Sequence, residues 1–257
     1  MSAPERQVRS TASPPEQLRS TSRRAAIIGG GGLLVGAAAG AGIGLTVAPT
    51  SASASTAQLD AAAKPTPTTE ELMVEHGLLK RTILVYREFM RRIAANQPVS
   101  RTLVLSSTQV IQDFIHGFHE PLEEGYVFPV VQRTMPQVIA DLLVQHARGR
   151  EQTQIILTAA GGKASVISGA ASHTAAEAMD KFVIMYEPHE SWEDTQVFPA
   201  LRAASTGTQI VQLAQHFSSL QNQQFGPNAF GAMLAKVEAA EKALGIYGLS
   251  MYTPAQV

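Results

Sequence analysis

Cysteine is absent from the 257-residue chain. Its absence excludes disulfides, zinc sites and iron–sulfur clusters held by thiolates, and a cysteine nucleophile. A basic balance is lacking as well, because the formal net charge is −1. Residues 1–54 carry five arginines and two glutamates, which leaves a net charge of about −4 on the remainder. Nucleic-acid binding depends on basic surfaces that neutralise phosphates, so we expect no nucleic acid as a partner.

Residues 1–54 have the order of segments found in export signals. A polar stretch ends in Ser22-Arg23-Arg24, an uncharged glycine-rich stretch follows over residues 25–48, and small residues at 51–54 offer a cleavage site. The paired arginines resemble a twin-arginine signal, which predicts export to the periplasm, the cell envelope or the extracellular space. The alternatives are an ordinary secretory signal and an uncleaved anchor, the one way in which we expect contact with a membrane. Residues 55–67 are predicted to be a flexible linker.

Apolar residues recur at helical spacing along the rest of the chain. The pattern and its breaks predict long helices over residues 68–95, 100–127, 134–159 and 164–196. Long helices with short connections predict an all-α, up-down-up-down four-helix bundle over residues 68–202. Residues 203–257 are predicted to be a helical extension with two additional helices, at 210–221 and 230–244. No strand is expected.

Two prolines lie inside these predicted helices. Pro121 lies in the second helix, whose inward stripe is expected to end with Leu122 and Tyr126. Because proline has no N–H, Pro121 cannot bond to the carbonyl of Gly117 and should bend the helix there. Pro188 has the corresponding effect in the fourth helix.

One motif occurs twice, seventy residues apart, at residues 119–129 and 189–199. Each copy contains His-x-x-x-Glu, a second acid directly after that Glu, and a terminal Phe-Pro. On a helix, positions i and i+4 lie on one face, so each copy directs one imidazole and one carboxylate toward the same point. A single His-x-x-x-Glu is more often a surface pair, so the prediction depends on the matched repeat.

The repeat extends upstream to one further histidine in each half, because residues 72–76 match residues 142–146 at the same offset. Buried imidazoles and carboxylates without partners cost stability, and a pair of iron, manganese or zinc ions would remove that cost. Four imidazoles and two bridging carboxylates fill eight of about twelve positions on two octahedral ions. The remaining positions suit O2, NO or peroxide rather than a large substrate. The predicted metal ligands are His76, His119, Glu123, His146, His189 and Glu193.

These motifs resemble those of the hemerythrin-like, or HHE cation-binding, family over residues 68–202, and are most similar to the branch that includes the repair-of-iron-centres proteins. The resemblance implies a non-heme di-iron site in which the four histidines are terminal ligands and the two glutamates are bridges beside an oxo or hydroxo group. Oxygen carriers of the family have another histidine where this chain has Arg150, and an Asp at the position of Asp194. The missing imidazole favours reaction with an oxidant over reversible oxygen transport.

Residues beside the motif have two interpretations each. His116 and its repeat counterpart Tyr186 either orient a ligand or are packed polar groups. Glu124 and Asp194 are expected to support the ligands or to be exposed, rather than to bind metal. Arg150 either pairs with one of them or extends to solvent.

Three further residues are expected to have no part in the site. His173 and His216 lie outside the seventy-residue register and are expected to be structural or exposed. Trp192 corresponds to Leu122 in the repeat, so it is expected to pack in the interior.

Three functions fit these residues. The first is an exported di-iron protein that binds or reduces O2, NO or peroxide. The second is a non-catalytic module that senses or stores iron or oxygen, and the third is a structural helical domain whose site holds zinc or no metal. Turnover separates the first from the second, and the residues alone predict neither turnover nor a protein partner.

Overall fold

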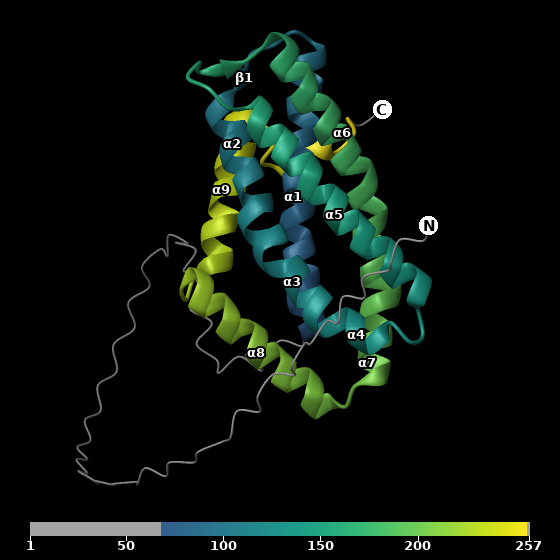
Figure 1. Cartoon of the computed structure of the whole chain (residues 1–257). Helices are drawn as coiled ribbons and strands as arrows, with labels where there is room; N and C mark the ends of the chain where they lie inside the picture. Colours follow the sequence, from purple (N-terminus) through teal and green to yellow (C-terminus); the bar gives the residue numbers. More distant parts are fainter. Residues whose placement is uncertain (1–67, 256–257) are drawn as a thin grey trace, which may run out of the picture. The chain divides into compact units, whose positions relative to one another are not determined.

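The computed structural model describes residues 68–255, which are almost entirely helical (Figure 1). This confirms the prediction of an all-α chain. The predicted export signal at residues 1–54 and the linker at residues 55–67 lie outside the described residues. Within residues 68–255, no helix combines the length and the apolar character needed to cross a membrane.

Helix α1 (Thr68–Ala94) has the predicted bounds. The chain turns at Asn96, whose φ of 53° is left-handed. It then forms the two-residue strand β1 (Val99–Ser100), which pairs antiparallel with β2 (Val166–Ile167). The expectation of no strand was therefore wrong, because strands this short carry no alternating pattern that a sequence could show.

The second helical segment is uninterrupted and extends beyond residue 127, its predicted end. Ser100 caps its start by accepting a hydrogen bond from the backbone N–H of Leu103. The segment alternates between α and π winding. Its parts are α2 (Arg101–Val110), the π-helix η1 (Ile111–His119), α3 (Glu120–Leu122), the π-helix η2 (Glu123–Val127) and α4 (Phe128–Val131).

The third and fourth segments complete the part of the molecule that carries the repeated motifs. Helix α5 (Pro136–Ala159) begins two residues after the predicted start and ends where predicted. The fourth segment comprises α6 (Gly169–Trp192), the π-helix η3 (Glu193–Val197) and α7 (Phe198–Ala204). It begins at Gly169 and not near residue 164 as predicted. The preceding residues instead form β2, and Gly169 adopts a φ of 57°, which favours glycine.

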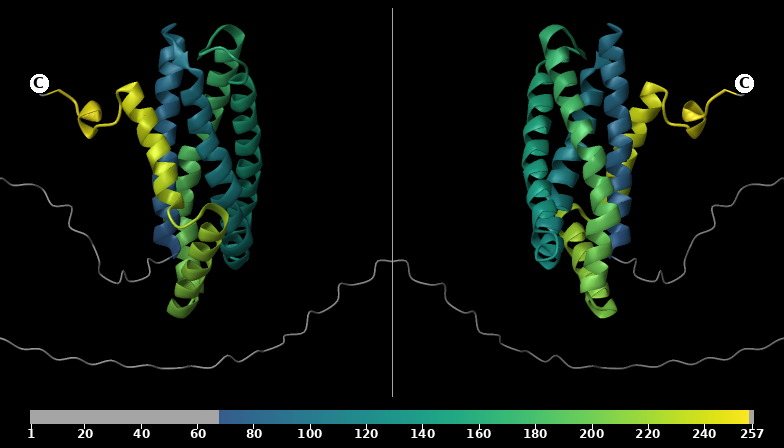
Figure 2. Two further views of the ribbon diagram at one scale, coloured as in Figure 1. Left: turned by 90° about the vertical axis from the view of Figure 1, so that its left-hand side faces the viewer. Right: turned by 90° about the vertical axis from the view of Figure 1, so that its right-hand side faces the viewer.

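These segments pack side by side, with α6 between α5 and α1, and with α2 and η1 against both α1 and α5 (Figures 1 and 2). The two predicted C-terminal helices are present and longer than expected, as α8 (Gly207–Phe225) and α9 (Ala229–Leu244). Helix α9 packs along α1 and α2, and α8 crosses the end at which α4 and α7 lie (Figure 1). A short 3-10 helix, η4 (Leu249–Tyr252), follows.

A π-turn occurs at the same place in both copies of the motif. The N–H of Phe128 bonds to the carbonyl of Glu123, five residues back, and Phe198 bonds to Glu193 in the same way. The wider turn changes the register of the residues within it. Tyr126, expected to point inward, is 39% exposed, and Val127 is buried in its place. The regular spacing of an α-helix could not have predicted that Val127 would be buried in place of Tyr126.

Pro121 cannot donate a backbone hydrogen bond, as predicted. It leaves the carbonyl of Gly117 without its usual helical donor, and the side-chain amide of Gln224 in α8 donates to this oxygen at 3.2 Å. The carbonyl left free by Pro121 is therefore also a point of attachment for the C-terminal extension.

Candidate metal centre

The structure brings the six predicted ligands together in the interior. One histidine comes from each long segment, and each glutamate begins a π-turn, a type of helix distortion that is frequent at functional sites. All six side chains are at least 97% buried. They are His76 on α1, His119 at the end of η1, Glu123 on η2, His146 on α5, His189 on α6 and Glu193 on η3.

The two histidines of the first half face Glu123. Nε2 of His119 lies 3.3 Å from Oε1 of Glu123, and Nε2 of His76 lies 3.8 Å from the same oxygen. Nε2 of His76 is also 3.3 Å from Oε2 of Glu193. The two imidazole nitrogens of the first half therefore lie close to oxygens of both carboxylates, Glu123 from the same half and Glu193 from the other.

The second half repeats the arrangement. Nε2 of His146 lies 3.5 Å from Oε2 of Glu123, and Nε2 of His189 lies 3.2 Å from Oε2 of Glu193. The two Nε2 atoms are 3.2 Å apart. This is close to the separation of about 3 Å expected for adjacent ligands that bind one ion at about 2.1 Å.

The chemistry of these donors fits a pair of metal ions. The oxygens of Glu123 and Glu193 are buried, and none has a hydrogen-bond partner among the described residues. Buried carboxylates without partners are costly, and a cation bound by them would remove the cost. The two oxygens of Glu123 face different histidine pairs, so this residue has the position of a bridge. The donor set suits iron, manganese or zinc.

Each of the four candidate ligand histidines has a hydrogen-bond partner at Nδ1, the ring nitrogen that faces away from the centre, as is usual for metal-binding imidazoles. Asp194 holds His76 at 2.8 Å, and Glu124 holds His146 at 2.9 Å. Asp194 and Glu124 therefore support the ligands, one of the two roles expected for them.

Sequence reasoning missed two such partners. Oε2 of Glu75 lies 2.7 Å from Nδ1 of His119, and Oε1 of Gln145 lies 2.8 Å from Nδ1 of His189. Glu75 and Gln145 are seventy residues apart and directly precede the other two ligand histidines. The repeat thus contained the signal, although the fold was needed to show which imidazole each residue contacts.

The Phe-Pro ends of the motifs acquire a role in packing. The ring of Phe128 stacks on His146, with centroids 5.5 Å apart. Phe198 stacks on His76 in the same way, with centroids 5.4 Å apart. Each phenylalanine therefore fixes the plane of a ligand imidazole that belongs to the other half of the repeat.

A second layer of polar residues surrounds Glu120, which is fully buried. Its Oε1 accepts a hydrogen bond from the hydroxyl of Tyr186 at 2.5 Å and lies 2.7 Å from Nδ1 of His116. Its Oε2 lies 2.7 Å from Arg150, which also contacts Glu124 at 2.5 Å. His116 and Tyr186 therefore meet at one carboxylate, and Arg150 pairs with Glu124, one of the two interpretations given for it.

The repeat counterpart of Glu120 has fewer partners. Glu190 is fully buried, and Nζ of Lys80 lies 3.3 Å from its Oε2, in the place that Arg150 has in the other half. Lys80 also contacts Asp194 at 3.1 Å. Burial raises the pKa of Glu190 to about 7. Burial alone would also raise the pKa of Glu120, but His116 and other donors lower it to about 2.

The imidazoles and carboxylates of the centre stabilise one another in their charged forms. Burial lowers the pKa of His76, but the neighbouring carboxylates of Asp194 and Glu193 outweigh it and raise this pKa to about 9. Burial favours a higher pKa for Glu193, yet His189 and His76 hold it well below its usual value. Because a metal binds neutral imidazole, metal binding at this centre should release protons.

The remaining predicted positions lie away from the centre. His173 is exposed, and His216 is exposed and hydrogen-bonds to the hydroxyl of Tyr126 at 2.9 Å. Both match the expectation. Trp192 does not, because its side chain is 52% exposed whereas Leu122 is buried. The halves of the repeat differ here because Trp192 lies at the rim of an open cavity between α5 and α6.

Comparison with known proteins gives relatives from mycobacteria. The chain is 40% identical over 192 residues to the uncharacterized protein Rv1995 of Mycobacterium tuberculosis, and equally to the uncharacterized protein Mb2018 of Mycobacterium bovis. The match spans 74% of this chain and 75% of each relative. The chain belongs to their family. No protein-family model and no solved structure matches it, so the function of this family has to be inferred from the site.

Proposed function

We propose that this chain is a hemerythrin-like protein, an up-down-up-down four-helix bundle that holds two non-heme iron ions and binds or reduces a small oxidant: O2, NO or peroxide. One observation carries the proposal. Four imidazole nitrogens and two carboxylates form two adjoining buried groups that share Glu123. The oxygens of the carboxylates have no other partner among the described residues. Bound iron would supply the exchangeable electrons and the open positions for the oxidant.

The surrounding residues orient the ligands and hold protons. The four Nδ1 contacts fix each imidazole with Nε2 directed inward, which requires no rearrangement when metal binds. On one side, the hydroxyl of Tyr186 donates to Oε1 of Glu120. This pair places a proton donor and a carboxylate next to the centre, where reduction of O2 or peroxide would consume protons.

The position of Arg150 supports reaction over reversible oxygen transport. The oxygen carriers that the motifs resemble have an imidazole there, whereas this guanidinium binds Glu120 and Glu124. The centre therefore has one histidine fewer and an added positive charge beside it. The alternative, a module that senses or stores iron or oxygen without turnover, uses the same ligands and differs only in lacking catalysis.

Export through a twin-arginine signal completes the proposal. That route carries folded proteins, which suits a chain that acquires its metal in the cytoplasm. The expected compartments remain the periplasm, the cell envelope and the extracellular space.

Metal analysis of histidine variants tests the site. Protein reconstituted with iron should hold about two irons per chain and show near-ultraviolet charge-transfer bands when oxidised. His119→Ala and His189→Ala should lose iron and melt at lower temperature, because metal binding and folding are coupled. The exposed His173→Ala and His216→Ala are matched controls and should retain both properties. Wild-type protein with less than about half an iron per chain, or equal loss in the controls, would refute the assignment.

Turnover is tested separately. Consumption of peroxide, O2 or NO by the iron-loaded protein with a chemical reductant distinguishes the redox function from sensing or storage. Loss of consumption in His189→Ala but not in His173→Ala would locate the reaction at the centre. Iron binding without consumption would support the sensing or storage module.

A further inference from the structure

Two cavities in the structure correspond to each other through the seventy-residue repeat. The first-half cavity, between α1 and η1, has a volume of about 200 Å³, and the second-half cavity, between α5 and α6, about 270 Å³. Both approach the centre behind a ligand imidazole. The corresponding lining residues are Glu71 and Asp141, Leu72 and Leu142, Glu75 and Gln145, and Phe118 and Pro188.

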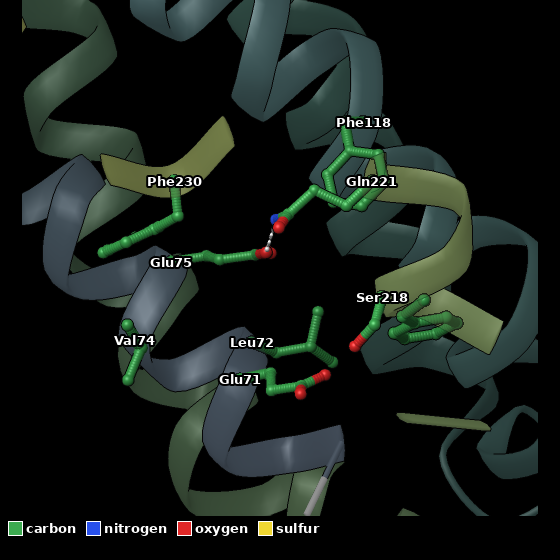
Figure 3. Close-up of a pocket in the computed structure, with 9 residues that line it drawn as sticks. Glu71, Leu72, Val74, Glu75, Phe118, Ser218, Gln221 and Phe230 are labelled. Atoms are coloured by element: carbon green, nitrogen blue, oxygen red, sulfur yellow. Dashed lines mark hydrogen bonds between the residues drawn. The ribbon is translucent and has the colours of Figure 1, made fainter. Parts of the chain in front are cut away.

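The C-terminal extension forms one wall of the first-half cavity. Phe217, Ser218 and Gln221 of α8, together with Phe230 of α9, form its outer wall. Figure 3 shows Ser218, Gln221 and Phe230 facing the residues of α1, with the amide of Gln221 directed at Glu75. The hydrogen bond between them is 3.4 Å long. The carboxylate of Glu75, held by Gln221, therefore lies between this cavity and the imidazole of His119.

The second-half cavity has no wall from the C-terminal extension. Its lining contains no residue of α8 or α9, and its rim includes the exposed Pro188 and Trp192. His189 itself lines this cavity, whereas the first-half cavity reaches Glu75 and not His119. The second-half cavity therefore connects the molecular surface to the imidazole of His189.

The two imidazoles also differ in the partner of Nδ1. His119 is bound by the carboxylate of Glu75, which Gln221 restrains further. His189 is bound by the neutral amide of Gln145. Hydrogen bonds to an ionised partner are roughly twice as strong as those between neutral groups. His189 therefore has an amide as its Nδ1 partner where His119 has a carboxylate.

We propose that the second-half cavity is the entrance to the metal centre, and that small uncharged oxidants exchange at the ion held by His146 and His189. The equivalent cavity in the first half reaches Glu75 and not the imidazole of His119. The chain's own asymmetry thereby makes the two metal positions unequal. This inference rests on the proposed function for the identity of the ligand, but the entrance itself is testable without metal.

The first experiment treats the full-length metal-free protein with diethyl pyrocarbonate, a reagent that acylates imidazole nitrogens. Peptide mass spectrometry measures the rate at which each histidine is modified. Val138→Trp narrows the second-half cavity and should slow modification of His189 several-fold. Ser218→Trp, at the wall of the first-half cavity, is the matched control and should leave the rate at His189 unchanged. The rate of modification is compared for the same histidine in different variants, so differences in protonation between one histidine and another do not affect the result.

Trp192→Ala provides a second test, because it widens the mouth of the second-half cavity and places no larger side chain in the interior of the protein. It should raise the rate of modification at His189 and leave His119 unchanged. The proposal is overturned if the rate at His189 does not respond to Val138→Trp or, should that variant not fold, to Trp192→Ala. Slowing by Ser218→Trp equal to that by Val138→Trp would also overturn it.

The second experiment follows association of nitric oxide with the reduced, iron-loaded protein by stopped-flow spectroscopy. Val138→Trp should lower the association rate constant several-fold and Ser218→Trp should not. Failure of the wild-type protein to bind iron or nitric oxide would refute the proposed function but leave the result with diethyl pyrocarbonate standing. An unchanged rate in Val138→Trp would refute the entrance and leave the function standing.

Discussion

Gly149 lies directly under the ring of Tyr186. A Cβ atom at residue 149 would overlap the hydroxyl and the ring of that tyrosine. This contact lets the Tyr186 hydroxyl reach Glu120 at 2.5 Å while the ring lies 5.1 Å from that of His189. Glycine at position 149 of α5 is therefore needed for Tyr186 to reach Glu120 beside the centre.

Gly149→Ala should displace Tyr186 and lower the free energy of unfolding by about 1–3 kcal/mol, the usual cost of overpacking a filled interior. Gly77→Ala is the matched control, because Gly77 is also helical and a Cβ there has no neighbour within 4 Å. It should be neutral or stabilising by about 0.5–1 kcal/mol, the usual gain of alanine over glycine in a helix. Denaturant unfolding of both variants measures the difference, and equal effects would contradict the contact.

Arg101 holds the connection between α5 and α6. Its guanidinium donates to the carbonyls of Ala160, Gly161, Ala164 and Val166. Arg101→Ala should therefore lower the free energy of unfolding by about 1–2 kcal/mol, because several charge-assisted bonds are lost at a partly exposed position. It should also increase hydrogen exchange at β2. Arg148→Ala removes an exposed arginine paired with Glu151 and should have a small effect. A silent Arg101→Ala would show that the connection is held by other contacts.

Glu71 should make stability depend on pH. Burial, and then repulsion from Glu75, raise its pKa to about 7. The folded state therefore binds a proton that the unfolded state releases above about pH 4.5, and this contribution disappears as the pH rises through about 7. Glu71→Gln should be more stable than wild type at pH 8 and equal to it near pH 4.

The size of this effect is limited because Glu71 is partly exposed, so solvent screening should keep it below about 1 kcal/mol. Melting temperatures between pH 4 and 8 measure it. Glu151→Gln, at an exposed position on α5, is the control. A difference between Glu71→Gln and wild type that is independent of pH would contradict the titration.

Export should depend on Arg23 and Arg24. Replacing both with lysine keeps the charge but should leave the protein in the cytoplasm if the signal is of the twin-arginine type. Lysine at Arg6 and Arg9 is the matched control and should not affect export. Cell fractionation measures both variants, and normal export of the Arg23/Arg24 variant would favour an ordinary secretory signal.

The sequence predicted the helices and the six candidate ligands because both depend on local spacing. His119 and Glu123 share a face of any helix, and the repeat identifies their counterparts at His189 and Glu193. The exposure of Tyr126 could not be predicted in this way, because a π-turn changes the count without leaving a periodic signal.

Contacts between distant segments were also beyond prediction from the sequence. Glu75 precedes His76 along the chain but binds His119, a pairing that arises only when α1 and η1 pack together. The start of α6 was placed too early for a similar reason. Residues 166 and 167 pair with β1, a partner more than sixty residues away.

The repeat also has a consequence for symmetry. Each half is a helical hairpin with two imidazoles and one carboxylate, and Glu123 must reach the nitrogens of the other half. One hairpin alone lacks that partner, whereas two copies around a two-fold axis would supply it as an isologous dimer. In such a dimer every substitution appears twice. Fusion into one chain removes that constraint, so Glu75 and Gln145 can differ and a single pair of helices can cover one face only.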